Sequence, residues 1–329
     1  MSFDRDPRIC IVGAGALSTR RIYPYIGAAG GQLVGICDLD AAKAERNSRR
    51  FGGRVYSDVE QMLKAETPDG VIICVGPRGH AQLAQLVLGL GYPVYTEKPP
   101  SANAADALAV ARKAKATGLL CVTAFKKRYN EAYTRAKQFI DARPADDLYS
   151  LSIDYCSKQY SHETLERTFL FDFCVHVIDL AGFLFGDVAE VFAFNKGKDA
   201  YAVSVRFANG AVGSFNFADG RSFQIPTEEV EITARGGNFM TVHNSSVWKI
   251  TENEKCTEWR EPPTFTSSGD SGNDTGHLAE IVDFFSALKE GRKTSRSSIY
   301  DSYKTMVVYE AIAQSAEMGA VVKVKYETV

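Results

Sequence analysis

The first 125 residues alternate short apolar runs with segments whose apolar residues recur at helical spacing. Apolar runs lie at 8–13, 32–37, 70–75, 93–96 and 119–125, and helical patterns lie at 19–27, 40–51, 57–65, 80–90 and 101–117. The run at 70–75 is apolar throughout, which is typical of a strand covered on both faces. Strands that alternate with helices form parallel sheets with right-handed crossovers. The alternation therefore predicts a doubly wound, parallel α/β sheet.

The pattern changes after about residue 127. Helical patterns at 130–141 and 170–185 flank a strand pattern at 148–156, strand signals dominate from 188 to 259, helical patterns at 276–289 and 299–318 follow, and a strand pattern at 321–326 closes the chain. Within the strand-rich stretch, Asn209-Gly210 predicts a hairpin turn. We expect a first domain of residues 1–127 and a second of residues 128–329 with a large, mostly antiparallel open sheet. Whether the C-terminal segment packs back on the first domain stays open.

Composition narrows the classes of function. The 329 residues are 45% hydrophobic and 24% charged, with a formal net charge of -2. A chain so near neutrality lacks the positive surface by which nucleic-acid binders attract phosphates. It has no run of about 18 apolar residues, so no membrane span is expected, and its N-terminus lacks the profile of a secretory signal. The seven cysteines form no Cys-x-x-Cys pair, and four of them, Cys10, Cys37, Cys74 and Cys121, lie in apolar runs, which indicates buried thiols and a cytoplasmic location.

A glycine turn follows the first apolar run. It reads Gly13-Ala14-Gly15-Ala16-Leu17-Ser18, which is G-x-G-x-x-S instead of G-x-G-x-x-G. Gly13 permits a tight turn, and Gly15 lets the backbone approach a pyrophosphate at the start of the following helix. The third position needs a small residue for close helix–strand contact, and Ser18 is small enough. In this strand–turn–helix context, the turn predicts a dinucleotide site.

Asp38 ends the second apolar run, at the position where an acidic residue typically contacts the ribose. Its carboxylate can accept hydrogen bonds from two ribose hydroxyls, and it repels the 2′-phosphate of NADP. The next residues, Leu39 and Asp40, supply no arginine for that phosphate. We therefore expect NAD as the cofactor. NADP stays open, since a loop that brought the guanidinium of Arg20 or Arg21 near the ribose would supply a positive charge for the 2′-phosphate.

Glu97 and Lys98 stand in the sequence YTEKPP, where the apolar run at 93–96 ends. Two prolines follow them, and prolines remove backbone donors and restrict φ, so the strand exit is stiff. Ligands bind beyond the carboxyl ends of parallel strands. We therefore expect Lys98 to be held at a cleft, with Glu97 positioning it or approaching the nicotinamide ribose.

Asp172, His176 and Asp179 interrupt the strongly apolar helical pattern at 170–185. Their spacings of four and three place them on one helical face. Burying an unpaired carboxylate or imidazole is costly, so such a stripe lines a cleft or pairs internally. We favour a functional role for His176, with Asp172 one turn before it, and a structural role for Asp179.

Together these motifs resemble the Gfo/Idh/MocA family, named for glucose–fructose oxidoreductase and inositol dehydrogenase. The resemblance is carried by GAGALS at 13–18, Asp38, EKP at 97–99 and D-x-x-x-H-x-x-D at 172–179, and it continues in GPRGH at 76–80, AFKKRYNEAY at 124–133 and YEAIAQSAEMG at 309–319. It implies a Rossmann domain followed by an α/β domain whose open sheet often mediates subunit contacts. We therefore expect a homodimer or homotetramer through the C-terminal sheet.

The resemblance also implies roles for individual residues. The residues expected to bind the cofactor are Gly13, Gly15, Ala16, Leu17, Asp38, Gly76, Pro77, His80, Glu97 and Lys98. Asp172 and His176 correspond to the acid and histidine expected at the substrate, and Lys126 and Lys127 stand where many members have Met or Arg. Apart from the resemblance, we expect Lys127, Lys158 and Tyr160 to contact a substrate, and an ordinary surface role stays open for each. One departure is the bulky stretch Thr168-Phe169-Leu170-Phe171, where members often carry glycines, so no particular substrate is carried over.

The family's usual chemistry is NAD(P)-dependent oxidation of a sugar or cyclitol hydroxyl, or the reverse reduction. Under this hypothesis His176 is the general base, because a histidine's reference pKa lies near 6.5. Lys98 hydrogen-bonds the reacting oxygen and stabilises developing negative charge. Asp172 orients His176 or binds a neighbouring hydroxyl. The expected partner is a small, polyhydroxylated molecule that is neutral or weakly anionic.

Two other functions stay open. One is a glycoside hydrolase that uses bound NAD transiently, with no net redox change. The other is a dinucleotide-sensing regulator, although the presence of both Lys98 and His176 argues against it, since a sensor needs no proton-transfer groups. The five histidines are scattered without metal-ligand spacing, so no metal site is expected.

Overall fold

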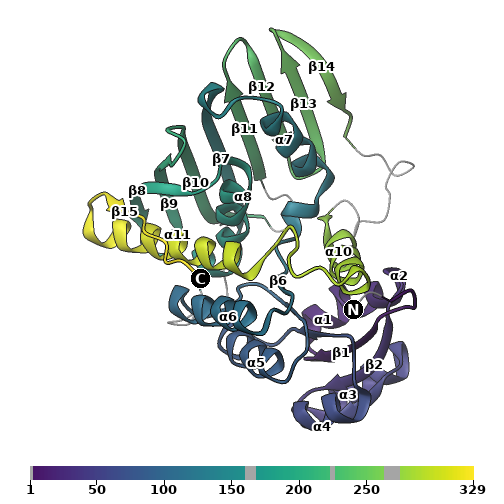
Figure 1. The fold of residues 1–329 in the computed structure, drawn as a ribbon. Helices are drawn as coiled ribbons and strands as arrows, with labels where there is room; N and C mark the ends of the chain where they lie inside the picture. Colours follow the sequence, from purple (N-terminus) through teal and green to yellow (C-terminus); the bar gives the residue numbers. More distant parts are fainter. Residues whose placement is uncertain (1–2, 160–167, 223–226, 263–274) are drawn as a thin grey trace. The chain divides into compact units, whose positions relative to one another are not determined.

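A computed structural model describes residues 3–159, 168–222, 227–262 and 275–329. The chain forms two compact units, each with its own sheet (Figure 1). The first contains Met1–Lys126, Gly276–Tyr303 and Val329, and the second contains Lys127–Thr275 and Lys304–Thr328. In the described part of the chain, no helix is both long enough and apolar enough to cross a membrane.

The first unit is built on a six-stranded parallel sheet in the order β3-β2-β1-β4-β5-β6, as the sequence pattern predicts. Its strands are β1 (Arg8–Val12), β2 (Gln32–Cys37), β3 (Arg54–Tyr56), β4 (Gly70–Ile73), β5 (Val94–Thr96) and β6 (Cys121–Thr123). β1 and β4 are neighbours but not consecutive, so the order of the strands reverses between them. Ligand sites of open α/β sheets lie at the carboxyl ends of the strands beside such a switch point.

Helices cover both faces of this sheet, which explains the continuous apolar runs of its strands. The helices are α1 (Ala16–Arg21), α2 (Tyr23–Ala28), α3 (Ala41–Phe51), α4 (Val59–Glu66), α5 (Pro77–Gly89), α6 (Ala104–Thr117) and α10 (His277–Glu290). On one face, Ile26 of α2 and Phe284 of α10 belong to the same core cluster as Ile11. On the other face, Met62, Val87 and Val110 pack with the alternate strand residues.

Three local features differ from the sequence prediction. The helix expected at 19–27 is two helices that meet at Ile22, because Pro24 in the first turn of α2 cannot continue a preceding helix. Helix α4 begins at Val59, two residues later than predicted, because it is capped by Asp58, whose carboxylate accepts a hydrogen bond from the Gln61 N–H at 2.8 Å. The three-residue strand β3 was not predicted, since it is too short to show a period.

The second unit contains a nine-stranded sheet in the order β14-β13-β12-β11-β7-β10-β9-β8-β15. Its strands are β7 (Leu148–Lys158), β8 (Val188–Lys196), β9 (Ala200–Phe207), β10 (Val212–Arg221), β11 (Thr227–Ala234), β12 (Asn238–His243), β13 (Val247–Glu252), β14 (Lys255–Arg260) and β15 (Val322–Lys323). Among the described strands of this sheet, only β7 and β10 pair in parallel, so the expected mostly antiparallel sheet is confirmed. The closing strand is only two residues long, shorter than the predicted 321–326.

One face of this sheet is covered by helices α7 (Glu131–Asp141), α8 (Val175–Phe185) and α11 (Ile299–Met318), whose apolar residues share its core (Figure 1). Short 3-10 segments lie at η1 (Lys126–Tyr129) and η2 (Ala145–Asp147), and a π-helical turn, η3 (Leu170–Cys174), leads into α8. The burial of β9 and of residues 212–219 of β10 alternates, so every second side chain there points away from the helices. We call this uncovered side the outer face.

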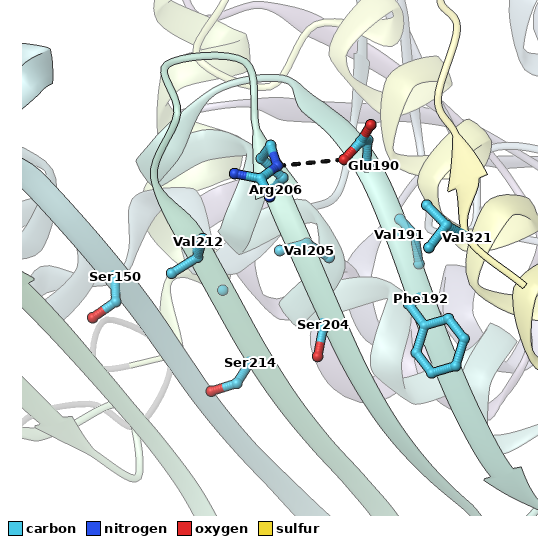
Figure 2. Close-up of a pocket in the computed structure, with 11 residues that line it drawn as sticks. Ser150, Glu190, Val191, Phe192, Ser204, Val205, Arg206, Val212, Ser214 and Val321 are labelled. Carbon is cyan, nitrogen blue, oxygen red and sulfur yellow. Dashed lines mark hydrogen bonds and ion pairs between the residues drawn. The ribbon is translucent and has the colours of Figure 1, made fainter.

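The outer face carries a shallow groove of about 380 Å³ over β7 to β10 (Figure 2). Ser150, Ser204 and Ser214 stand on neighbouring strands there, and an ion pair between Arg206 and Glu190 closes one end. Small uncharged side chains therefore form the middle of this face.

Candidate active site

The glycine turn after β1 is tightly packed at its first position and open at its second. Gly13 has φ +108°, and a Cβ there would lie 2.0 Å from the Cys74 carbonyl oxygen after β4. A Cβ on Gly15 would meet nothing within 4 Å. The turn is thus locked against the neighbouring strand at Gly13, while the backbone at Gly15 is accessible to a ligand.

Ser18, the residue that departs from the glycine pattern, is fully buried. Its hydroxyl is within 3.1 Å of the carbonyl oxygens of both Gly13 and Gly15. A serine at the third position therefore closes the turn with a side-chain hydrogen bond that glycine lacks. Ala16 and Leu17 are exposed beside it, as residues that line a cofactor site need to be.

Asp38 follows β2 and is half-buried. One carboxylate oxygen accepts a hydrogen bond from the Ala14 N–H at 2.6 Å, and the other accepts one from the Asp40 N–H at 2.8 Å. The carboxylate is thereby fixed against the glycine turn. An open glycine backbone with a fixed carboxylate beside it fits the pyrophosphate and ribose of a dinucleotide.

The loop after β4 is tied to the exit of β5 by His80. Gly76 precedes α5 and Pro77 begins it, while His80 is 3% exposed. The Val75 N–H donates to Nε2 at 3.1 Å, and Nδ1 lies 2.8 Å from the Pro99 carbonyl oxygen. Because a carbonyl only accepts, Nδ1 carries the proton and the ring is neutral. Burial lowers the pKa of His80 to about 4. The ring thus holds two loops of the site, and direct contact with the cofactor stays a prediction.

Glu97 and Lys98 follow β5 at the carboxyl edge of the sheet. Glu97 is buried, and its carboxylate accepts a hydrogen bond from the Lys98 N–H at 3.0 Å. Burial raises the pKa of Glu97, while the charges of Lys98 and Lys126 oppose this. Lys98 is half-buried and precedes a cis peptide bond to Pro99. The first unit therefore gathers the glycine turn, Asp38, His80 and Lys98 at one edge of its sheet.

In the second unit, Asp172 lies in the π-helical turn η3 and His176 lies in the first turn of α8. Asp172 is buried and His176 is half-buried. The Thr168 hydroxyl accepts a hydrogen bond from the Phe171 N–H at 3.2 Å, which supports the start of this helix. π-helical turns occur frequently at functional sites. The catalytic roles of both residues stay predictions.

Asp179, on the same helix, is fully buried in a hydrogen-bonded cluster. Arg128 donates to it through Nε and a terminal nitrogen, each at 2.8 Å, and the Thr305 hydroxyl donates at 3.0 Å. The bidentate pair joins η1 to α8, and the Thr305 hydroxyl joins α8 to α11. A structural role for Asp179 accounts for all of these contacts.

Lys127 is 6% exposed, and its ammonium forms an ion pair with Glu228. The hydroxyls of Tyr133 and Ser245 also hydrogen-bond Glu228. Burial acts to raise the pKa of Glu228, but Lys127 and the hydroxyls outweigh it, so the pKa is lowered. The predicted contact of Lys127 with substrate is not tested by these internal contacts. Lys158 is exposed at the end of β7, and Tyr160 lies outside the described residues.

Among the buried acids that sequence reasoning missed are Glu228 and Glu280. Both have a signal in the sequence. Glu228 alternates with inward-facing Val230 and Ile232 on β11, and Glu280 precedes Phe284 by one turn on the apolar face of α10. An acid at a core-facing position is rarely left without a function or a partner. Among the described residues, no group of three or more His, Cys, Asp or Glu side chains is placed to hold a metal ion.

Known proteins resemble this chain in both of its units. Residues 7–125 match the model "Oxidoreductase family, NAD-binding Rossmann fold", and residues 158–324 match "Oxidoreductase family, C-terminal alpha/beta domain". D-apiose dehydrogenase of Paraburkholderia graminis is 24% identical over 347 residues, covering 96% of this chain and 89% of that enzyme. Myo-inositol 2-dehydrogenase of Thermotoga maritima is 23% identical over 222 residues, covering 63% and 66%.

A solved structure of levoglucosan dehydrogenase in complex with NADH has a TM-score of 0.87 at 20% identity, covering 98% of this chain and all of that one. At this identity the likeness concerns the fold. The two family matches cover both sheets, and the first includes the glycine turn, Asp38 and Lys98. The chain therefore belongs to the Gfo/Idh/MocA family of oxidoreductases, with an NAD-binding Rossmann domain and a C-terminal α/β domain.

Proposed function

We propose that the protein is an NAD-dependent dehydrogenase that acts on a hydroxyl-bearing carbon of a small sugar, cyclitol or sugar derivative. The observation that carries this proposal is the Asp38 carboxylate, fixed by the Ala14 N–H at 2.6 Å beside the open backbone of Gly15. A carboxylate held there favours an unmodified ribose and repels a 2′-phosphate. The names of the relatives, which are dehydrogenases of apiose and inositol, support a polyhydroxylated substrate.

The chain's own residues then have separate tasks. His176 takes the proton of the substrate hydroxyl in oxidation and returns it in reduction. Lys98 donates a hydrogen bond to the reacting oxygen and stabilises its developing negative charge. Asp172 orients His176 or binds a neighbouring hydroxyl. Bound NAD supplies the hydride acceptor, so the substrate loses one hydride to the cofactor and one proton to His176.

The experiment that tests this function is a screen of sugars and cyclitols with NAD and with NADP, following the absorbance of the reduced cofactor. We expect turnover with NAD on at least one polyol or sugar. Release of a glycoside without net reduced cofactor would support the hydrolase alternative instead. If His176→Ala and Lys98→Ala both kept near-normal turnover on the substrate found, the assigned roles would be wrong.

We also propose that two or four copies associate through the outer face of the second sheet. The support is a row of directly paired outward residues, Ser152, Ser214 and Ser204, across β7, β10 and β9. Exposed Val212 and Phe194 lie in the rows on either side of it, with 48% and 66% of their surface accessible. Uncharged and apolar surface of this kind is typical of contact between subunits.

A further inference from the structure

Glu280 is a buried carboxyl on the apolar face of α10, in the first unit. The residue is 3% exposed, and neither of its carboxyl oxygens has a hydrogen-bond partner among the described residues. One turn later, the Phe284 ring packs 5.7 Å from the ring of Tyr95 on β5. The Tyr95 hydroxyl is likewise buried and forms no hydrogen bond of ordinary length among the described residues, yet it is near enough to the Glu280 carboxyl to lower the pKa of that group. Two polar groups therefore meet inside an otherwise apolar cluster.

Buried polar groups are nearly always satisfied, so an unsatisfied pair needs an explanation. An ionised carboxylate in this position would carry a large desolvation cost, whereas a protonated carboxyl carries much less. The N-terminus of α10 favours an ionised Glu280, but a helix dipole is a weaker effect than the burial of a charge. The surroundings therefore favour the neutral acid.

Glu97 is the second carboxyl that acts on Glu280. Burial raises the pKa of Glu280 well above its usual range, and the negative charge of Glu97 raises it further, while Tyr95 and Lys126 oppose this. Glu97 has the Lys98 N–H at 3.0 Å and the charges of Lys98 and Lys126 nearby. Two neighbouring buried carboxyls do not both ionise readily, and the better-supported charge is the one on Glu97.

We propose that Glu280 carries its proton at neutral pH and is a positioning residue for Glu97 and Lys98, because it leaves the negative charge of the pair on Glu97. The proton is a property of the folded chain alone, whereas the positioning role rests on the proposed function. His277 begins the same helix, and its pKa is lowered by burial and further by the positive charges of Lys126, Arg21 and Lys98. The group of titratable residues around the exit of β5 thus includes the start of α10.

The proton is tested by unfolding wild-type protein and Glu280→Gln in urea between pH 5 and pH 8. A raised pKa means that the folded state keeps a proton that the unfolded state releases above a pH of about 4.3. Its stabilising effect is complete below that pH and is lost as the pH rises toward the folded-state pKa. Glutamine cannot ionise, so the unfolding constant of wild type should rise relative to that of Glu280→Gln by about tenfold per pH unit.

The matched control is Glu66→Gln. Glu66 is equally buried in the first unit, but it accepts a hydrogen bond from Tyr56 and pairs with Arg8. Glu66→Gln should be less stable than wild type because it loses these partners. The ratio of unfolding constants between wild type and Glu66→Gln should not show the tenfold rise per pH unit expected for Glu280→Gln. A ratio of unfolding constants between wild type and Glu280→Gln that is flat with pH would overturn the proposal.

The positioning role is tested by the pH profile of kcat on the substrate that the screen identifies. Glu280→Ala should lower kcat by about tenfold with little change in KM, and Glu280→Gln should restore most of it and lack the alkaline decline of wild type. Equal losses in both variants would contradict positioning by a neutral carboxyl. If no substrate is turned over, the proposed function fails, and the urea experiment still decides the protonation of Glu280.

Discussion

At the residue scale, the Asp38 carboxylate closes the glycine turn and is the group that we expect to contact the ribose of NAD. Its two oxygens are held by the N–H groups of Ala14 and Asp40. Hydrogen bonds to a charged group contribute about 1.5–3 kcal/mol, and each 1.4 kcal/mol is a factor of about ten in an equilibrium. A carboxylate lost here should therefore weaken NAD binding and reduce the repulsion of NADP.

We expect Asp38→Asn to lower kcat/KM for NAD by about ten- to a hundredfold and to narrow the preference over NADP. Steady-state kinetics with both cofactors on the same substrate would measure this. Asp40→Asn is the control, because Asp40 is exposed and caps α3 through the N–H groups of Ala42 and Lys43. An unchanged cofactor preference in Asp38→Asn would contradict the ribose contact.

His80, at the same edge of the sheet, makes the stability of the folded protein depend on pH. Its pKa is lowered to about 4 by burial, from an ordinary value near 6.5. As the pH falls, His80 is protonated in the unfolded state before it is protonated in the folded state. The contribution of neutral His80 to the free energy of unfolding is therefore complete above a pH of about 6.5 and is lost as the pH falls toward 4. The shift corresponds to about 3 kcal/mol. His277 shifts in the same direction, to about 2, and adds to the loss.

The corresponding variant is His80→Asn, which shortens the link between the Val75 N–H and the Pro99 carbonyl. We expect it to lower the free energy of unfolding at pH 7 by about 1–3 kcal/mol. At pH 4.5 the difference from wild type should be much smaller, because wild type has by then lost most of this contribution. Urea unfolding at both pH values measures it, with exposed His243→Asn as the control. A difference that is equal at both pH values would refute the account.

Single residues were predictable where a local rule acts. The position of Gly13, of Asp38 at the end of β2 and of Asp40 as a helix cap all follow from the neighbouring sequence. The partners of His80 were not predictable, because Pro99 comes from another loop and the contact depends on the packing of β4 against β5. Glu280 was readable as an acid on an apolar helix face, but its neighbour Tyr95 was not.

At the element scale, the buried pair of Lys127 and Glu228 ties η1 to β11. Removing one partner of a buried ion pair leaves an uncompensated charge and costs about 3–5 kcal/mol. We expect Lys127→Met to destabilise the protein by that amount, and the double variant Lys127→Met/Glu228→Gln to be less destabilised than the sum of the single variants. Urea unfolding of the four proteins gives the coupling energy.

Lys137→Met is the matched control for this cycle. Lys137 pairs with Asp141 at 2.7 Å on the exposed side of α7, where such pairs contribute about 1 kcal/mol or less. A Lys127→Met variant that kept its stability and lost only affinity for substrate would show that Lys127 faces the ligand. That outcome would support its predicted role in substrate binding over the structural account.

The periodicity of apolar residues predicted the order of helices and strands, but it predicted the breaks within helices only in part. Pro24 explains the break between α1 and α2, and a stricter use of the proline rule would have found it. The π-helical turn at Leu170–Cys174 has no comparable signal, since the pattern of apolar residues there fits an ordinary helix. Beside this turn, Phe169 packs against Tyr155 and Phe171 against Tyr309, and neither contact is visible in the local sequence.

At the scale of the whole molecule, the chain order differs from the grouping of its elements. Helix α10 follows the strands of the second unit in sequence, yet Phe284 and Leu288 belong to the core of the first unit together with Ile9 and Ile11. Its amphipathic pattern predicts a helix with one buried face. That pattern cannot say which sheet the face covers, because any large apolar surface satisfies it.

The last prediction concerns the outer face of the nine-stranded sheet. Ser214 of β10 lies directly between Ser152 and Ser204 in the middle of that face, and substitution of an outward side chain there should barely affect the fold of one chain. A buried, unpaired arginine in a subunit interface is strongly unfavourable. We therefore expect Ser214→Arg to sediment as a smaller species than wild type, with an unchanged circular dichroism spectrum. Gln138→Arg, exposed on α7 at the helix-covered side, should keep the wild-type assembly. Equal sedimentation of wild type and Ser214→Arg would place the contact between subunits elsewhere or exclude it.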